Sequence, residues 1–267
     1  MRIALGLEYD GSSFHGWQSQ ADGRGVQDAV ESAVGRMAGH RVTVISAGRT
    51  DSGVHATRQV AHFETDASRP ATAWSRGVNV FLPPAIAICW AQPVDDEFHA
   101  RLSATGRHYT YLLLVRPVRP ALSRERWGWY HRPLSLEPMR EAASLILGTH
   151  DFSAFRAAQC QAKTPVKTLK RLDISREDEV FRFDVHADAF LQHMVRNIIG
   201  SLIVVGSGRQ PASWLRTVLD AHQRAESGAT FAASGLHLTG VDYHPRWKLP
   251  PTHAPLHAPV FAPRDSA

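Results

Sequence analysis

Residues 41–65 read RVTVISAGRTDSGVHATRQVAHFET, a stretch that predicts two strands joined by a loop carrying one carboxylate. The segments 41–46 and 59–64 have the β-branched composition and the alternation of strands. The loop Gly48-Arg49-Thr50-Asp51-Ser52-Gly53-Val54-His55-Ala56 places Asp51 between two glycines beside basic and hydroxyl side chains. Functional side chains concentrate on loops held by a rigid scaffold. Asp and Gly also form ordinary turns, so the loop alone leaves both interpretations open.

The two halves of the chain have the same predicted order of elements, βαββαβ, and the Asp51 loop lies in the first half. In the first half the expected elements are strand 1–9, helix 26–38, strands 41–47 and 59–65, helix 71–80 and strand 85–93. In the second half they are strand 107–115, helix 136–147, strands 168–175 and 180–186, helix 189–205 and strand 236–243, with a further short helix at 212–222. The helix 26–38 is the clearest, because its apolar residues recur every three or four positions.

Two such units in tandem predict an α+β fold with ferredoxin-like or RNA-recognition-motif-like halves. Mainly antiparallel sheets would then join around a central catalytic cleft. We expect an N-terminal half at 1–105 with the Asp51 loop and a C-terminal half at 106–247. The Pro- and Ala-rich tail at 248–267 is expected to be disordered. No repeat of individual residues accompanies the repeated order.

The charge favours a polyanionic partner. The chain has 26 Arg and 4 Lys against 25 acidic residues, a net charge of +5. Arginine has the planar fork that matches phosphate and stacks on bases, and a basic balance suits nucleic acid. Hydrophobic residues make up 43% of the chain, enough for a core.

Other function classes leave no trace in the sequence. The two cysteines, Cys89 and Cys160, have no ligand spacing, and there is no P-loop, GxSxG elbow, HExxH helix or zinc-deaminase pattern. We therefore expect no metal and no cofactor. No signal peptide pattern opens the chain and no apolar run approaches a membrane span, so a cytoplasmic protein without membrane contact is expected.

Two side chains in the second half allow more than one interpretation. Arg196 lies in the middle of an almost wholly apolar helix, where it either extends its head to the surface or pairs with a carboxylate such as Asp51. Tyr109 shares one strand face with Tyr111, either as a core aromatic or as a platform for an exposed base. The segment 9–20 is polar, rich in glycine and aromatic, as in a binding loop.

Taken together, these segments resemble the tRNA pseudouridine synthase A family, also called tRNA pseudouridine synthase I. The resemblance covers about residues 1–247 in the family's order. It is carried by Tyr9-Asp10-Gly11, Gly16-Trp17-Gln18, Val26-Gln27, Gly48 to Ala56, Phe98-His99-Ala100-Arg101, Arg107 to Tyr111, Phe190 to Asn197 and Gly235-Leu236. Several ordered motifs are far more specific than a single GRTD.

The resemblance implies isomerisation of uridine to pseudouridine in the anticodon stem-loop of tRNA, at positions 38, 39 and 40, without cofactor or metal. It makes Asp51 the catalytic nucleophile and Arg196 its ion-pair partner. It places Tyr109 and Leu236 beside the target base and lets Arg49 fill the space that the flipped nucleotide leaves. Further RNA contacts are expected at Gln18, Arg58, Arg101, Arg107 and His108. The family also implies a homodimer with tRNA as its partner.

Two other classes of function stay open on the residues alone. A non-catalytic RNA-binding module would explain the charge and the paired order of elements, but it would not require Asp51 and Arg196 together. A metal-assisted nuclease would explain RNA affinity and the 15 histidines, but the sequence offers no cluster of carboxylates for Mg²⁺.

Overall fold

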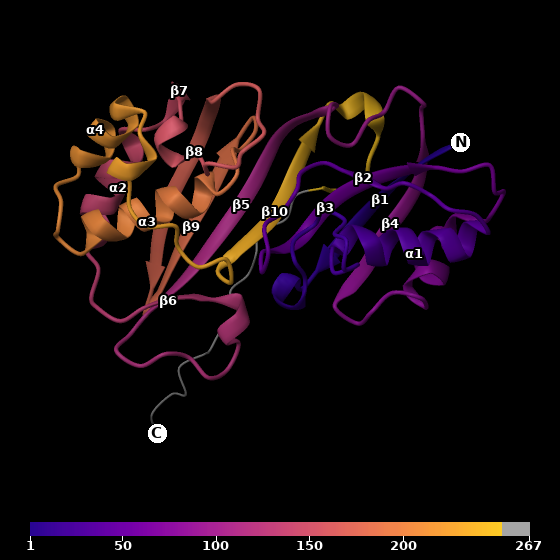
Figure 1. The fold of residues 1–267 in the computed structure, drawn as a ribbon, viewed down its shortest axis with the longest axis horizontal. Coiled ribbons are helices and arrows are strands. Elements are labelled where there is room, and N and C mark those ends of the chain that lie inside the picture. Colours follow the sequence, from indigo (N-terminus) through magenta and orange to yellow (C-terminus); the bar gives the residue numbers. More distant parts are fainter. Residues whose placement is uncertain (253–267) are drawn as a thin grey trace.

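The computed structural model describes residues 1–252. Figure 1 shows a long twisted sheet with helices packed against one of its faces. The predicted tail at 248–267 lies mostly outside the described residues. The helices are α1 (Val26–Ala38), α2 (Leu136–Ser144), α3 (Met194–Gly206) and α4 (Trp214–Ala221). The strands are β1 (Arg2–Tyr9), β2 (Ile45–Ser46), β3 (His55–Glu64), β4 (Ile86–Val94), β5 (Ala104–Val115), β6 (Gly128–Tyr130), β7 (Gly148–Asp151), β8 (Val166–Glu177), β9 (Val180–Ala187) and β10 (Leu236–Tyr243).

One sheet runs through the whole chain in the order β4-β1-β3-β10-β5-β9-β8-β7, with β2 beside β3 and β6 beside β5. Its pairs are antiparallel except β3 with β10 and β5 with β6. This confirms the predicted α+β class with a mainly antiparallel sheet.

The N-terminal and C-terminal parts of the sheet meet between β3 and β10. Only two residue pairs join these strands, His237 with His55 and Leu238 with Ala56. On one side the strands follow the order β4-β1-β3, and on the other the order is β10-β5-β9-β8-β7. Because the sheet is continuous across this point, the division of the chain into an N-terminal half ending at 105 and a C-terminal half ending at 247 stays a prediction.

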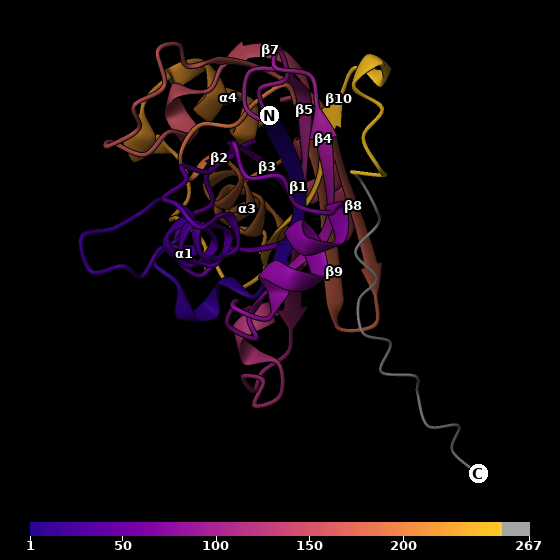
Figure 2. The same cartoon turned by 90° about the vertical axis from the view of Figure 1, so that its right-hand side faces the viewer.

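The core lies between the sheet and its helices. Alternate residues of β1, namely Ile3, Leu5 and Leu7, are fully buried in the same cluster as Val30 and Val34 of α1. Burying a side chain of this size contributes about 1.5 to 3 kcal/mol. Figure 2 shows the helices on one side of the sheet, and the segment after β10 on the other.

Helix α1 has the ends that its sequence predicts. The backbone amide of Gly25 donates to Asp28 Oδ2 at 2.9 Å, which satisfies a donor before the first turn. The helix ends at Gly39, whose φ of 81° is readily adopted by glycine. The predicted bounds of 26–38 are therefore confirmed.

Three of the predicted elements differ most from the structure. The strand expected at 41–47 is reduced to β2, since the amide of Val44 donates to Glu31 Oε1 at 2.8 Å instead of to a strand. The helix expected at 71–80 contains a π-helical turn at Ala73–Gly77. The helix expected from 189 begins only at Met194, because the preceding His193 has the left-handed φ of 63°.

Candidate active site

The loop that carries Asp51, residues 47–54, is held by glycines of the preceding 9–20 segment. A Cβ on Gly11 would lie 2.0 Å from the carbonyl oxygen of Val54, and one on Gly16 would lie 2.6 Å from that of Thr50. Gly16 also has a φ of +89°. Any larger residue would push the two segments apart. The glycines of the sequence motif therefore serve this close approach.

Side-chain hydrogen bonds fix the same loop from β1 and β3. Tyr9 Oη and Thr50 Oγ1 are 2.8 Å apart, and Gln59 Nε2 donates to the carbonyl of Gly48 at 2.8 Å. The amide of Trp17 donates to the carbonyl of Thr50 at 3.0 Å. Burial raises the pKa of Tyr9 to about 12, so its phenol keeps its proton near neutral pH. The loop is thus anchored at Gly48 and Thr50, just before Asp51, by residues of β1, β3 and the 9–20 segment.

Arg196 of α3 meets Asp51 across the centre of the molecule. Its Nη1 donates to Asp51 Oδ2 at 3.3 Å, and its Nε donates to the carbonyl of Phe231 at 2.8 Å. The two charged side chains are only 16% and 24% exposed. The surface-directed alternative for Arg196 is therefore excluded, and the guanidinium has two fixed acceptors.

His193 is a neighbour of Asp51 that the sequence analysis did not single out. Its Nε2 lies 3.6 Å from Asp51 Oδ2, and its side chain is 31% exposed. The left-handed backbone of His193 is unusual for a residue with a side chain, and such strain is often found at functional sites. The available signal was its place in the motif Phe190 to Asn197, immediately before the first residue of α3.

Tyr109 lies on the helix-covered face of β5, next to Leu238 of β10 in the sheet register. It is buried, and its ring meets Phe190 edge to face at 5.2 Å between centroids. Burial raises the pKa of Tyr109, and the charges of Tyr9 and Asp51 raise it further. A neutral aromatic ring therefore lies in the electrostatic reach of the aspartate.

Leu236 lies on the same face as the two tyrosines of β5. It is buried and pairs with Tyr111 in the antiparallel register, and directly opposed residues share one face of a sheet. Tyr111 in turn donates to the carbonyl of Ala232 at 2.9 Å. Leu236 is thus an apolar neighbour of Tyr111, and its place beside the target base stays a prediction.

The predicted RNA contacts are spread over several surfaces. Arg49 and Arg101 are exposed, and Gln18 is half-buried. Arg107 instead binds four backbone carbonyls, those of Ala104, Asp188, Ala47 and Arg101, at 3.4, 2.8, 2.9 and 2.9 Å. These bonds connect the end of β2 to the start of β5, so Arg107 has a structural role. Its role in binding RNA stays a prediction.

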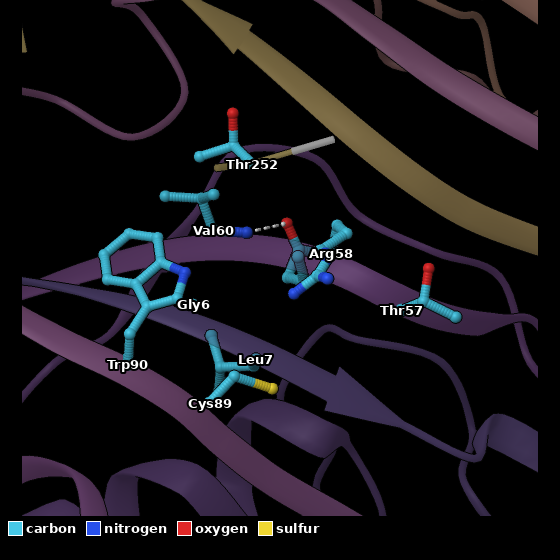
Figure 3. Close-up of a pocket in the computed structure, with 9 residues that line it drawn as sticks. Gly6, Leu7, Thr57, Arg58, Val60, Cys89, Trp90 and Thr252 are labelled. Atoms are coloured by element: carbon cyan, nitrogen blue, oxygen red, sulfur yellow. Dashed lines mark hydrogen bonds between the residues drawn. The ribbon is translucent and has the colours of Figure 1, made fainter. Parts of the chain in front are cut away.

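Arg58 lines a small pocket with Cys89 and Trp90 (Figure 3). A Cβ on Gly6 would collide with the ring of Trp90, so Trp90 covers the face of β1 opposite to Leu5 and Leu7. That face points away from α1. Arg58 therefore lies on the other side of the sheet from Arg196, and its contact with RNA stays a prediction.

His108 also lies on the face opposite to Tyr109, because neighbouring residues of a strand alternate. Its Nε2 is 2.8 Å from Asp242 Oδ1.

Within residues 1–252, no helix is both long and apolar enough to cross a membrane.

Comparison with known proteins identifies the class. A family model described as tRNA pseudouridine synthase matches residues 7–102 and 142–244, and this chain belongs to that family. Asp51, Arg196 and Leu236 fall inside the matched segments, whereas Tyr109 falls between them. The family membership expected from the ordered motifs is thus confirmed.

The similarity to individual proteins extends over nearly the whole chain. A protein of Dechloromonas aromatica named tRNA pseudouridine synthase A is 55% identical over 250 residues, which is 94% of this chain and 95% of that protein. A protein of the same name from Chromobacterium violaceum is 56% identical over 251 residues, covering 94% and 96% of the two chains.

Proposed function

We propose that this protein isomerises uridine to pseudouridine in tRNA, in the anticodon stem-loop at positions 38, 39 and 40. The observation that carries the proposal is the contact between Asp51 and Arg196, which joins the two most specific motifs of the chain at 3.3 Å. The family membership and the name of its close relatives support the reaction and the tRNA substrate.

The chemistry requires a single well-placed carboxylate. The N1–C1′ bond breaks, the uracil rotates, C5 bonds to C1′, and the proton on C5 is released while N1 gains one. Asp51 can promote these steps by attacking C1′, by adding to C6 or by assisting elimination to a glycal. In each route the carboxylate must point at the target nucleotide. Arg196 and His193 flank its Oδ2 atom and fix that direction.

The target base must leave its stack before Asp51 can reach it. Flipping a nucleotide costs a few kcal/mol, which contacts to the extruded base and to the space it leaves can offset. Tyr109 and Leu236 supply an aromatic ring and an apolar side chain on the site's face of β5 and β10. Arg49, which is exposed on the Asp51 loop, can enter the vacated space.

The test is turnover on unmodified tRNA. Incubation with a transcript of an anticodon stem-loop should convert uridine to pseudouridine, detected by chemical labelling and reverse transcription, with no change in RNA length or mass. Saturable binding without conversion would favour the non-catalytic RNA-binding module. Cleavage that a chelator prevents would favour the nuclease.

Substitution of Tyr109 tests its role as a stacking ring. We expect Tyr109→Phe to keep most of the single-turnover rate and Tyr109→Leu to lose about 1 to 3 kcal/mol of stabilisation of the flipped base. Among residues 1–252 the phenol oxygen has no hydrogen-bond partner that Phe would lose, whereas the ring contacts Phe190. Equal rates for the two variants would mean that Tyr109 packs in the core and does not stack on the base. Thermal unfolding of both variants separates this effect from misfolding.

Substitution of Arg49 tests whether this arginine, which we place in the space left by the flipped nucleotide, also contacts the phosphate backbone. Arg49→Gln should lower the slope of log affinity against log salt concentration by about one, since each neutralised phosphate releases counterions. Arg216→Gln is the matched control, because Arg216 lies on the distant helix α4 and pairs with Asp220. If the two variants have the same slope, Arg49 does not contact the backbone of tRNA.

The quaternary structure and location also remain proposals. We propose a homodimer with tRNA, for which light scattering should give twice the chain mass of 29.5 kDa. A mass of one chain at working concentration would contradict the dimer. The cytoplasmic location expected from the sequence stays a prediction.

A further inference from the structure

Three side chains with metal-binding atoms meet on the face of the sheet opposite to Tyr109. His108 of β5 and His186 of β9 are direct cross-strand neighbours, and Asp242 comes from β10 on the other side of β5. The three strands are adjacent in the middle of the sheet (Figure 1). The cluster therefore rests on a rigid scaffold and not on loops.

The geometry of this cluster converges on one carboxylate. His108 Nε2 is 2.8 Å from Asp242 Oδ1, and His186 Nε2 is 2.9 Å from Asp242 Oδ2. The two imidazole rings stack with centroids 3.9 Å apart and an angle of 17° between them. One donor atom from each residue lies within 4.8 Å of the others. The side chains are 20%, 20% and 35% exposed, so solvent reaches the cluster.

Gly106 provides the space in which these groups meet. A Cβ at Gly106 would lie 2.4 Å from Asp242 Oδ2 and 2.6 Å from His186 Nε2. Any other residue would displace the carboxylate or the imidazole. The absence of a side chain at this position therefore permits the convergence of the three donors.

We propose that His108, His186 and Asp242 form a binding site for a divalent transition-metal ion of the zinc class. Two imidazole nitrogens and one carboxylate oxygen are a common zinc donor set, with water as a fourth ligand. Binding needs each ring to carry its proton on Nδ1, so that the ion takes the place of the Nε2 protons. The donors then close from hydrogen-bond distance to about 2.1 Å, and the rings tilt out of their stack.

The charges set the expected strength of the site. One carboxylate and two neutral imidazoles leave a bound divalent ion with a net charge of +1. Lys170 carries a further positive charge near His186, which weakens the binding of any cation. We therefore expect a site of moderate affinity. A bound ion would link β10 to β5 and β9 and so stabilise the fold. The site is separate from Asp51, which lies with Arg196 on the helix-covered side.

The test is a titration of the metal-free full chain with Co²⁺, followed by the visible absorption of the ion, and with Zn²⁺, followed by calorimetry. We expect one equivalent to bind. His186→Ala and Asp242→Asn should each weaken binding by at least about tenfold, because loss of even an outer-shell partner has an effect of this size. Zn²⁺ should raise the unfolding temperature of the unchanged chain, and the rise should vanish in both variants.

Two matched controls exclude adventitious histidine binding. His131→Ala removes an exposed histidine elsewhere on the surface, and the double variant His253→Ala/His257→Ala removes those of the tail. Both controls should bind Co²⁺ like the unchanged chain. Loss of binding in the tail variant alone, or equal affinity in His186→Ala, would overturn the proposal. If His186→Ala fails to fold by circular dichroism, His186→Gln takes its place.

Discussion

Asp51→Asn is expected to lower isomerisation below detection while the fold and tRNA binding persist. The amide has the shape of the carboxylate but lacks its charge and its nucleophilic oxygen, and loss of a covalent nucleophile commonly lowers the rate by orders of magnitude. The loop should keep its conformation, because its anchors are the backbone of Thr50 and the side chain of Tyr9 rather than Asp51.

The measurement is single-turnover conversion of uridine in an anticodon stem-loop, with tRNA affinity and thermal unfolding on the same samples. Ser52→Ala is the matched control in the same loop, where the hydroxyl of Ser52 donates to the carbonyl of Phe14 at 3.2 Å. This variant should retain its activity. Turnover by Asp51→Asn above the level of wild-type contamination would mean that Asp51 is not the catalytic nucleophile.

Arg196→Met is expected to impair catalysis and stability together. The guanidinium binds two acceptors, Asp51 Oδ2 and the carbonyl of Phe231, so its loss leaves two partly buried oxygens without their donor. Breaking a fully buried ion pair costs about 3 to 5 kcal/mol. The observed pair is 16% and 24% exposed, which places the expected stability loss below that range. Arg196→Lys should rescue little, since one ammonium lacks the planar fork that binds both acceptors.

A double-mutant cycle isolates the contact itself. For Asp51→Asn combined with Arg196→Met, the coupling in the free energy of unfolding should be about 0.5 to 3 kcal/mol, the usual range for residues in contact. The exposed pair Arg140 and Glu137 on α2 is the control, and its coupling should be about 0 to 1 kcal/mol. Additivity of the Asp51 and Arg196 variants would mean that the two side chains do not interact in solution.

The sequence by itself determined the family and the elements with the clearest local pattern. The period of the apolar residues predicted α1 to its observed bounds, and the Asp51 loop lies between β2 and β3 as expected. The glycines of the motifs were visible as well, although only the structure shows that Gly11 and Gly16 allow the approach to the Asp51 loop. Such features are readable because hydrophobic period, turn residues and motif order are properties of neighbouring positions.

Only the tertiary structure decided which distant side chains meet. The sequence left two positions open for Arg196, and the packing of α3 against the Asp51 loop selected the ion pair. The same packing revealed His193, whose left-handed backbone no periodicity predicts.

The sheet register determined which side chains of neighbouring strands lie on the same face. The alternation of β5 separates His108 from Tyr109, and the order β10-β5-β9 collects His108, His186 and Asp242 into one cluster from three segments without metal-ligand spacing. A register is set by the burial of whole strand faces and by pairing between remote segments. For that reason the residues of each motif could be predicted from the sequence, while the contacts between motifs required the fold.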